Sequence, residues 1–323
     1  MNVTYLPEGR LLNTPENRRA VAGIEALTAA MERGLIVEGT ALRCTPEHDL
    51  LVALGPFTGV IPRLEAAAGV AQGAVREVAI LSRVGRPVCC VVTGLDIDPG
   101  GEVRPILSRR LAQERALDYF LSHLSPGDIL PATVTHLKSF GAFVDMGCGV
   151  ISLIGIDRIS VSRIGHASLR FVPGQEIFAA VLSVDRAARR FSLTHRELLG
   201  TWAENAARFS PGDTVPGFIR GVQDYGLFVE LTPNLSGLAE PREDMVPGAR
   251  VCTHIKSIFP DRMKIKLLIV DTLPPLDRPE PPRYVLTHGH LSQWRYAPPG
   301  CAKAGAFTQF DPEPSISGVP DRP

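Results

Sequence analysis

A segment of this chain occurs twice, 85 residues apart, and this repeat limits the possible folds more than any other feature. The segment "SPGDILPATVTHLKSFGAFVDM" begins at Ser125, and "SPGDTVPGFIRGVQDYGLFVEL" begins at Ser210. Proline, glycine and aromatic positions stay aligned without a gap as far as Val144 and Val229. Two copies of a unit of this size indicate duplicated domains and argue against a solenoid of small repeats.

A third, more divergent copy lies upstream of these two. "GLIVEGTAL" at Gly34 aligns with "GDILPATVT" at Gly127, and "LLVALGPFTGVIP" at Leu50 has the pattern of the two strands that follow. The segments that join the copies also match each other, and both have helical character. In the second join, a stripe of apolar residues at helical spacing predicts packing rather than a binding surface: Leu198, Trp202, Ala206 and Phe209.

Each copy is rich in short apolar stretches that glycines and prolines separate. In the copy that begins at Ser125, a long connector, "GIDRISVSRIGHASLRFVPGQ", lies between the third and the fourth of five such stretches. Five short strands with a long connector at this place are typical of an OB-fold barrel. We therefore predict an all-β protein with linking helices, built from tandem five-stranded OB-fold barrels.

The predicted domain organisation follows from the repeat. Thr14 is expected to cap a helix that ends near Gly34. In the tail, "YVLTHGHLSQWRYAPPG" has enough apolar content to dock as a short strand or hairpin. The predicted parts are an N-terminal segment with this helix (1–33), a degenerate barrel (34–108), a linker helix (109–125), a second barrel (126–196), a second linker helix (197–210), a third barrel (211–272) and an irregular, proline-rich C-terminal tail (273–323).

Composition restricts the class of protein further. Lys and Arg number 34, as do Asp and Glu, and a net charge of zero argues against coating nucleic acid by bulk charge, although not against a local basic groove. The six cysteines show no metal-ligand spacing, which indicates reduced thiols. The N-terminus lacks an apolar signal, and no stretch approaches the about 18 apolar residues of a spanning helix. We therefore expect a cytoplasmic protein with no membrane partner, and we expect a monomer.

Aromatic residues flank a glycine at the same place in both clear copies, as Phe140 and Phe143 in one and as Tyr225 and Phe228 in the other. Exposed rings on a barrel reduce solubility unless they contact a partner, and stacking of a base on such a ring is worth about 1–3 kcal/mol. The alternative is that the rings pack against the connector or a neighbouring domain. The exchange of Phe for Tyr favours the surface role, because a buried Tyr hydroxyl needs a partner.

The alternation of side chains along a strand predicts which residues of this segment face outward. Gly141 can accommodate a turn or bulge that brings Phe140 to the same outer surface as Phe143. By the same alternation Asp145 should also point outward, whereas the remaining positions should point into the barrel: Ala142, Val144 and Met146.

The segment "GDILPATVTHLKSFGAFVDMGCGVISLI" resembles the RNA-binding domain of the ribosomal protein S1 family. That pattern is a glycine-led first strand, an F-G-x-F-V turn and strand, and a third strand of the type G-[LIV]-[LIV]-x. The resemblance covers residues 127–196 and 212–271, and more weakly residues 34–108. It implies that bases stack on Phe140, Phe143, Tyr225 and Phe228. It also implies phosphate contacts for the basic residue before the final strand, which is Arg190 or Lys264.

The sequence departs from this family pattern on the third strand. Many family members have a histidine there, and the position is assigned here to Ser152 in one copy and Glu240 in the other. Ser152 stays in the predicted RNA-binding set, although the histidine contact is lost or altered. The first copy has Pro62 at that place and lacks the aromatic pair, so we predict a structural or ribosome-facing role for it.

Further basic residues complete the predicted RNA-binding set. In the connector, Arg158, Arg163 and His166 could contact phosphates or bases, or they could form a solvated face. Residues 250–266 of the third copy carry five Lys or Arg residues and one Asp, a net charge of +4 without His254. Along the phosphates of a bound strand we place Lys138, Arg190, Arg220, Lys256 and Lys264.

We predict non-catalytic binding of single-stranded RNA. The resemblance implies binding of messenger RNA in translation, with the small ribosomal subunit as a further partner. The chain has no P-loop, G-x-S-x-G, H-E-x-x-H or C-x-x-C motif, so we expect no catalytic residue, metal or cofactor. One alternative is a protein-interaction module that docks on the ribosome or an RNA-decay complex. A second is an enzyme with an unrecognised site.

Overall fold

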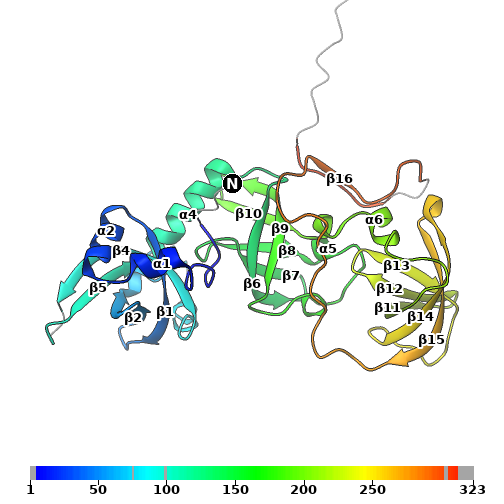
Figure 1. Ribbon diagram of the computed structural model, residues 1–323, viewed down its shortest axis with the longest axis horizontal. Helices are drawn as coiled ribbons and strands as arrows, with labels where there is room; N and C mark the ends of the chain where they lie inside the picture. Colours follow the sequence, from blue (N-terminus) through cyan, green and yellow to red (C-terminus); the bar gives the residue numbers. More distant parts are fainter. Residues whose placement is uncertain (1–4, 75, 98–99, 302–304, 312–323) are drawn as a thin grey trace, which may run out of the picture.

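The computed structural model describes residues 5–74, 76–97, 100–301 and 305–311. Three closed five-stranded barrels follow one another along the chain and lie in a row (Figure 1). In the first barrel the strand order is β1-β2-β3-β5-β4, with β3 parallel to β5 and β1 antiparallel to β4. The other two barrels have the same order, and the predicted tandem OB-fold architecture is confirmed.

The strands of each barrel are short, apart from two or three longer ones that curve around it. The first barrel contains β1 (Ile36–Cys44), β2 (Leu50–Leu54), β3 (Phe57–Ile61), β4 (Pro87–Ile97) and β5 (Val103–Ser108). The second contains β6 (Ile129–Lys138), β7 (Gly141–Asp145), β8 (Ile151–Gly155), β9 (Glu176–Asp185) and β10 (Arg190–Thr194). The third contains β11 (Thr214–Gln223), β12 (Gly226–Thr232), β13 (Leu235–Ala239), β14 (Arg250–Phe259) and β15 (Lys264–Leu273).

The helices connect or cover the barrels. They are α1 (Pro15–Ala20), α2 (Ile24–Glu32), α3 (Val78–Leu81), α4 (Arg109–His123), α5 (Ile156–Ile159) and α6 (Trp202–Ala206), with 3-10 turns η1 (Arg63–Glu65), η2 (Ala167–Leu169), η3 (Arg196–Leu199) and η4 (Pro260–Arg262). Helix α4 separates the first barrel from the second (Figure 1), whereas η3 and α6 together form the second join. No helix in the described part of the chain is long and apolar enough to cross a membrane.

The N-terminal helix differs from the prediction, because the chain forms two helices where one was expected. Thr14 caps α1 as predicted, since its hydroxyl oxygen accepts a hydrogen bond from the Asn17 amide at 3.2 Å. The side chain of Asn17 then bonds both backbone groups of Glu38, at 2.8 and 2.9 Å. This anchor fixes α1 on strand β1, and the extended backbone at Gly23 redirects the chain into α2.

The apolar stripe of the second join packs as predicted. Leu198, Trp202 and Ala206 are buried, and they belong to one apolar cluster with the core of the third barrel. Phe209 packs against the same cluster. The repeated Ser-Pro-Gly-Asp segment is the turn that precedes the first strand of a barrel, because the Asp128 carboxylate accepts a hydrogen bond from the Ser125 amide at 2.8 Å.

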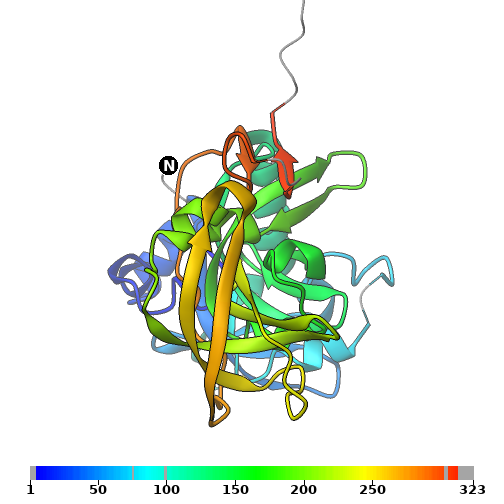
Figure 2. The ribbon, with the colours of Figure 1, turned by 90° about the vertical axis from the view of Figure 1, so that its right-hand side faces the viewer.

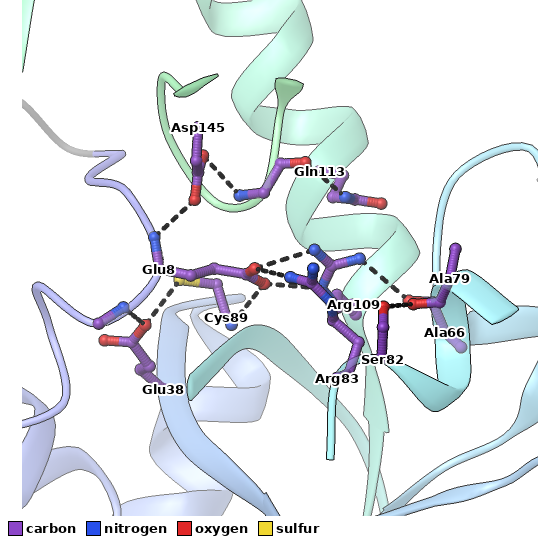
Figure 3. A network of polar contacts seen from close by, with 12 residues as sticks. Glu8, Glu38, Ala66, Ala79, Ser82, Arg83, Cys89, Arg109, Gln113 and Asp145 are labelled. Atoms are coloured by element: carbon purple, nitrogen blue, oxygen red, sulfur yellow. Dashed lines mark hydrogen bonds and ion pairs between the residues drawn. The ribbon is translucent and has the colours of Figure 1, made fainter. Parts of the chain in front are cut away.

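The first and second barrels are joined by a buried network of charges around Glu8 (Figure 3). The Glu8 carboxylate accepts hydrogen bonds from Arg109 at 2.6 and 2.9 Å and from Arg83 at 3.1 Å. The side chains of Glu8 and Arg109 are each 6% exposed. Residues 5–12, which we call the N-terminal strap, therefore lie between the two barrels and contact both.

Asp145 was predicted to point outward, and the structure contradicts this. The side chain is buried at the end of β7, where its carboxylate accepts hydrogen bonds from the amides of Gly147, Gly149 and Glu8 at 2.8–2.9 Å. Burial and the nearby Glu8 carboxylate raise the pKa of Asp145 to about 7. Alternation failed here because the strand ends, and the carboxylate satisfies the amides of the turn that follows.

The C-terminal tail turns back from β15 and lies across the second and third barrels (Figures 1 and 2). Residues 283–301 and 305–311 form what we call the C-terminal strap. Its predicted docking as a short strand or hairpin is confirmed, since β16 (Gln293–Arg295) pairs with β17 (Phe307–Gln309). Trp294 and Tyr296 are buried, and the Leu291 amide donates to Gly127 O at 2.9 Å.

His290 of the C-terminal strap lies between two carboxylates. Its Nδ1 lies 2.9 Å from an Asp128 oxygen, and its Nε2 lies 3.0 Å from an Asp311 oxygen. These hydrogen bonds, the one with Asp128 first, raise the pKa of His290. A pKa that is raised by folding gives stability that is fully present below about pH 6.5 and is lost as the pH rises through the folded-state pKa.

We therefore expect the strap to be held more firmly at pH 6 than at pH 8. The measurement is hydrogen exchange of the Leu291 amide at both pH values, corrected for the intrinsic exchange rate. His290→Gln should remove the pH dependence and leave protection at its high-pH level. Equal pH dependence in the variant and the parent chain would show that His290 does not hold the strap.

Candidate nucleic-acid interface

The two aromatic pairs have the same geometry in the second and third barrels. The ring centroids of Phe140 and Phe143 lie 5.9 Å apart with an interplanar angle of 88°. Those of Tyr225 and Phe228 lie 6.2 Å apart, also at 88°. Each perpendicular pair forms a corner on the barrel surface, where a flat base that stacks on one ring meets the edge of the other.

A glycine in an unusual conformation makes each corner possible. Gly141 has φ +155° and Gly226 has φ +151°, a region that residues with a side chain rarely adopt. A Cβ atom on Gly141 would collide with the carbonyl of Ile154 on the neighbouring strand, and one on Gly226 would collide with that of Ala239. The glycine therefore lets the turn approach the third strand closely, so that both rings reach one face.

The rings lie at the surface. Phe140 is 54% exposed, Tyr225 66% and Phe228 39%, whereas Phe143 is half-buried. Ala142, Val144 and Met146 point into the barrel, as the alternation predicts. Packing within the described chain therefore does not account for the exposed rings.

Strand register places a basic residue at the same position on the aromatic face of the second barrel and on that of the third. Phe143 is paired with Leu153, and Phe228 with Leu238. On the last strand, Ser192 lies beside Leu153 and Lys266 beside Leu238. Two residues before these come Arg190 and Lys264, which are both exposed and have no ion-pair partner among the residues that the structure describes.

Basic side chains surround His136, which lies beside the aromatic corner of the second barrel. His136 is paired with Phe143 across β6 and β7. Burial, and then the charges of Arg83, Arg86 and Lys138, lower the pKa of His136. Lys138 is exposed at the end of β6, so this predicted residue lies near the aromatic corner with its ammonium free to meet phosphate.

Residues 124–196, which contain the whole second barrel, match the S1 RNA binding domain. The second barrel therefore belongs to the S1 RNA binding domain family, and we call it the S1 domain. The chain is 33% identical over 189 residues to the small ribosomal subunit protein bS1 of Leuconostoc lactis, which is 54% of this chain and 44% of that protein. It is 30% identical over 195 residues to bS1 of Staphylococcus aureus (strain COL), 55% of this chain and 49% of that protein. The chain thus spans about half the length of these curated relatives.

A solved structure of a multidomain protein with nucleic acid binding domains from Streptococcus pneumoniae aligns with 73% of this chain and 73% of its own. The identity is 14% and the TM-score is 0.25, and an alignment at this level supports no conclusion about function.

Two predicted residues of the S1 domain and the third barrel lie in positions that do not suit RNA binding. Ser152 is buried inside the S1 domain, where its hydroxyl donates to Phe191 O at 2.8 Å. Two nitrogens of the Arg220 guanidinium donate hydrogen bonds to the two oxygens of the Glu230 carboxylate, at 2.8 and 3.1 Å. Arg170 of the S1 domain donates to the same carboxylate at 2.6 Å. These contacts leave Ser152 and Arg220 to structural roles.

Strand register also corrects the predicted alignment of the third strands. Ser152 is paired with Val144, and Gly237 is paired with Val229. Because Val144 and Val229 are equivalent positions of the repeat, Ser152 corresponds to Gly237 and not to Glu240. Glu240 lies beyond β13.

The connector of the S1 domain contributes more to domain packing than the sequence indicated. Its Val161 amide donates to the side chain of Asn234 in the third barrel at 3.0 Å. Among the predicted connector residues, Arg158 pairs with Asp157 at 3.2 Å, His166 accepts from the Ser168 amide, and Arg163 is exposed. No local signal in the sequence could reveal the contact between Val161 and Asn234, because these two residues are 73 positions apart.

Lys256 lies at the surface of the third barrel. It pairs with Glu240 at 2.8 Å, and both side chains are exposed. An exposed pair of this kind is worth only about 0–1 kcal/mol, so a phosphate can compete for the ammonium group.

Proposed function

We propose that this chain binds single-stranded RNA without catalysis, through the S1 domain and the third barrel, in translation on the small ribosomal subunit. The observation that carries the proposal is the pair of perpendicular aromatic corners, which recurs with nearly the same spacing and angle in two barrels. The match to the S1 RNA binding domain and the bS1 relatives support the same function.

The chemistry of binding follows from the two faces. The bases of a single strand are free to stack on protein rings, here Phe140, Phe143, Tyr225 and Phe228. Every base offers a flat face for this contact. Arg190, Lys264 and Lys138 meet the phosphates and release counterions from the strand. A strand long enough to reach both faces binds more tightly than either face alone allows.

We retain the predicted units 126–196 and 211–272 as the parts that bind RNA, and we assign the first barrel a structural or ribosome-facing role. The first barrel lacks an aromatic corner, since Phe57 on β3 is half-buried and packs against its own core. We propose further that the chain acts in the cytoplasm and as a monomer.

The test is fluorescence anisotropy with a labelled, unstructured RNA of about a dozen nucleotides at several salt concentrations. Three neutralised phosphates predict a slope of log K against log salt of about −2. Matched single-stranded DNA and duplex RNA serve as controls, and the duplex should bind more weakly because its bases are not free to stack. Absence of binding at low salt would contradict the proposal and favour a role in docking to protein.

A further inference from the structure

Two segments from elsewhere in the chain border the aromatic face of the third barrel beside Phe228. A cleft of about 530 Å³ lies over β13 and the start of β15, and Phe228 is one of the residues that line it. Val161 of the S1-domain connector lines the cleft from one direction, and Tyr296 and Ala306 of the C-terminal strap also line it. Figure 2, in which the third barrel faces the viewer, shows the hairpin of the strap at one end of this barrel.

Hydrogen bonds fix both of these segments to the third barrel. Ser162 of the connector shares a hydrogen bond of 2.9 Å with Ser236 on β13. The Tyr296 hydroxyl donates to Asn234 O at 2.6 Å, and Tyr296 O accepts from the Trp202 amide at 3.0 Å. The cleft is therefore already formed in this structure, and a ligand would not have to order these segments on binding.

Among the described residues that line the cleft, the charged side chains are both basic. Arg262 and Lys264 line it, and no acidic side chain is among the described residues that do. Neither has an ion-pair partner within the described ranges, and both are exposed. An aromatic ring and apolar groups beside unpaired cations suit a flat base attached to a phosphate. The volume also lies within the range of about 300–1,000 Å³ that is typical of small-ligand sites.

We propose that this cleft holds one unstacked nucleotide of a single-stranded RNA, with its base on Phe228 and an adjacent phosphate on Arg262 and Lys264. The C-terminal strap is then part of the RNA-binding site of the third barrel and not only a clamp between barrels. This inference rests on the proposed function.

The inference is tested by a substitution on the C-terminal strap that fills the cleft with a bulky side chain. Ala306→Trp places a large ring at a position that lines the cleft, and we expect it to weaken binding of a labelled 12-nucleotide oligouridine by about tenfold or more. Gln309→Trp is the matched control, because it adds the same ring at an exposed position of β17 that does not line the cleft. Circular dichroism and thermal unfolding verify that both variants fold.

A second variant keeps the test independent of strap folding. Arg262→Ala removes an exposed cation, so it should weaken binding and reduce the salt slope. The reduction should be at most about 0.7, the contribution of one phosphate on a single strand, because Lys264 still contacts that phosphate. If Phe228→Ala weakens binding but Ala306→Trp and Arg262→Ala do not, the third barrel binds RNA on its open surface, and the inference is wrong while the proposed function stands. If the parent chain binds no RNA, the proposed function fails as well.

Discussion

Replacement of Glu8 by alanine is expected to destabilise the junction of the first two barrels by about 3–5 kcal/mol, the cost of removing one partner of a buried ion pair. Glu8 is the carboxylate that both Arg109 and Arg83 contact, and the side chain of Arg109 is 6% exposed. Without Glu8, two guanidinium groups remain close together with little access to water. The loss of the desolvated charge pair therefore outweighs the entropy that a freed strap would gain.

The free energy should be measured locally, because a chain of several barrels need not unfold in one step. Hydrogen exchange of the Cys148 amide reports on the junction, since this amide donates to Leu6 O of the N-terminal strap at 2.8 Å. Glu16→Ala is the matched control: Glu16 pairs with Arg19 on the surface of α1, where both side chains are more than 70% exposed, and its loss should change stability little. A loss of protection in Glu8→Ala no larger than in the control would contradict the assigned role of the network.

Removal of both stacking rings, Phe143→Ala with Phe228→Ala, should produce the largest loss of RNA affinity. Each ring is expected to contribute about 1–3 kcal/mol per base, and sites on separate barrels should act nearly additively, which gives about 2–6 kcal/mol for the double variant. Each single variant should lose about half of this. Thermal stability should stay nearly unchanged, most clearly for Phe228, which is 39% exposed.

Two controls define the alternatives. Phe307→Ala removes a ring that is 45% exposed and lies outside both faces, and it should leave affinity unchanged. Phe171→Ala removes a fully buried ring and should destabilise the S1 domain by about 3–5 kcal/mol. If the stacking variants behave like Phe171→Ala and keep their affinity for RNA, the rings are core residues and the stacking model is wrong.

Features that depend on near neighbours in the chain were predictable from the sequence. The period-2 alternation placed Ala142, Val144 and Met146 in the core, and the repeated glycine predicted that Phe140 and Phe143 share a face. The structure adds the angle between the rings, because it depends on how closely β7 approaches β8.

The predictions that failed concern residues with at least one partner outside the local pattern. The Asp145 carboxylate accepts hydrogen bonds from Gly147 and Gly149 in the turn that follows its strand, and the Glu8 amide, 137 residues away, donates a third. Arg220 is held by Glu230 on the adjacent strand, and Arg170 of another barrel completes that contact. A local pattern carries no information on such partners, so each of these residues looked like an ordinary surface position.

The repeated barrels and the shared surface of the aromatic rings could be predicted from the amino-acid sequence, because alternation, turn glycines and strand lengths act over a few residues. That two straps hold the three barrels together, and that the C-terminal strap lines the cleft beside Phe228, became visible only in the folded chain. These contacts pair groups from separate domains, and such groups come within hydrogen-bonding distance only when the barrels have taken up their folded arrangement.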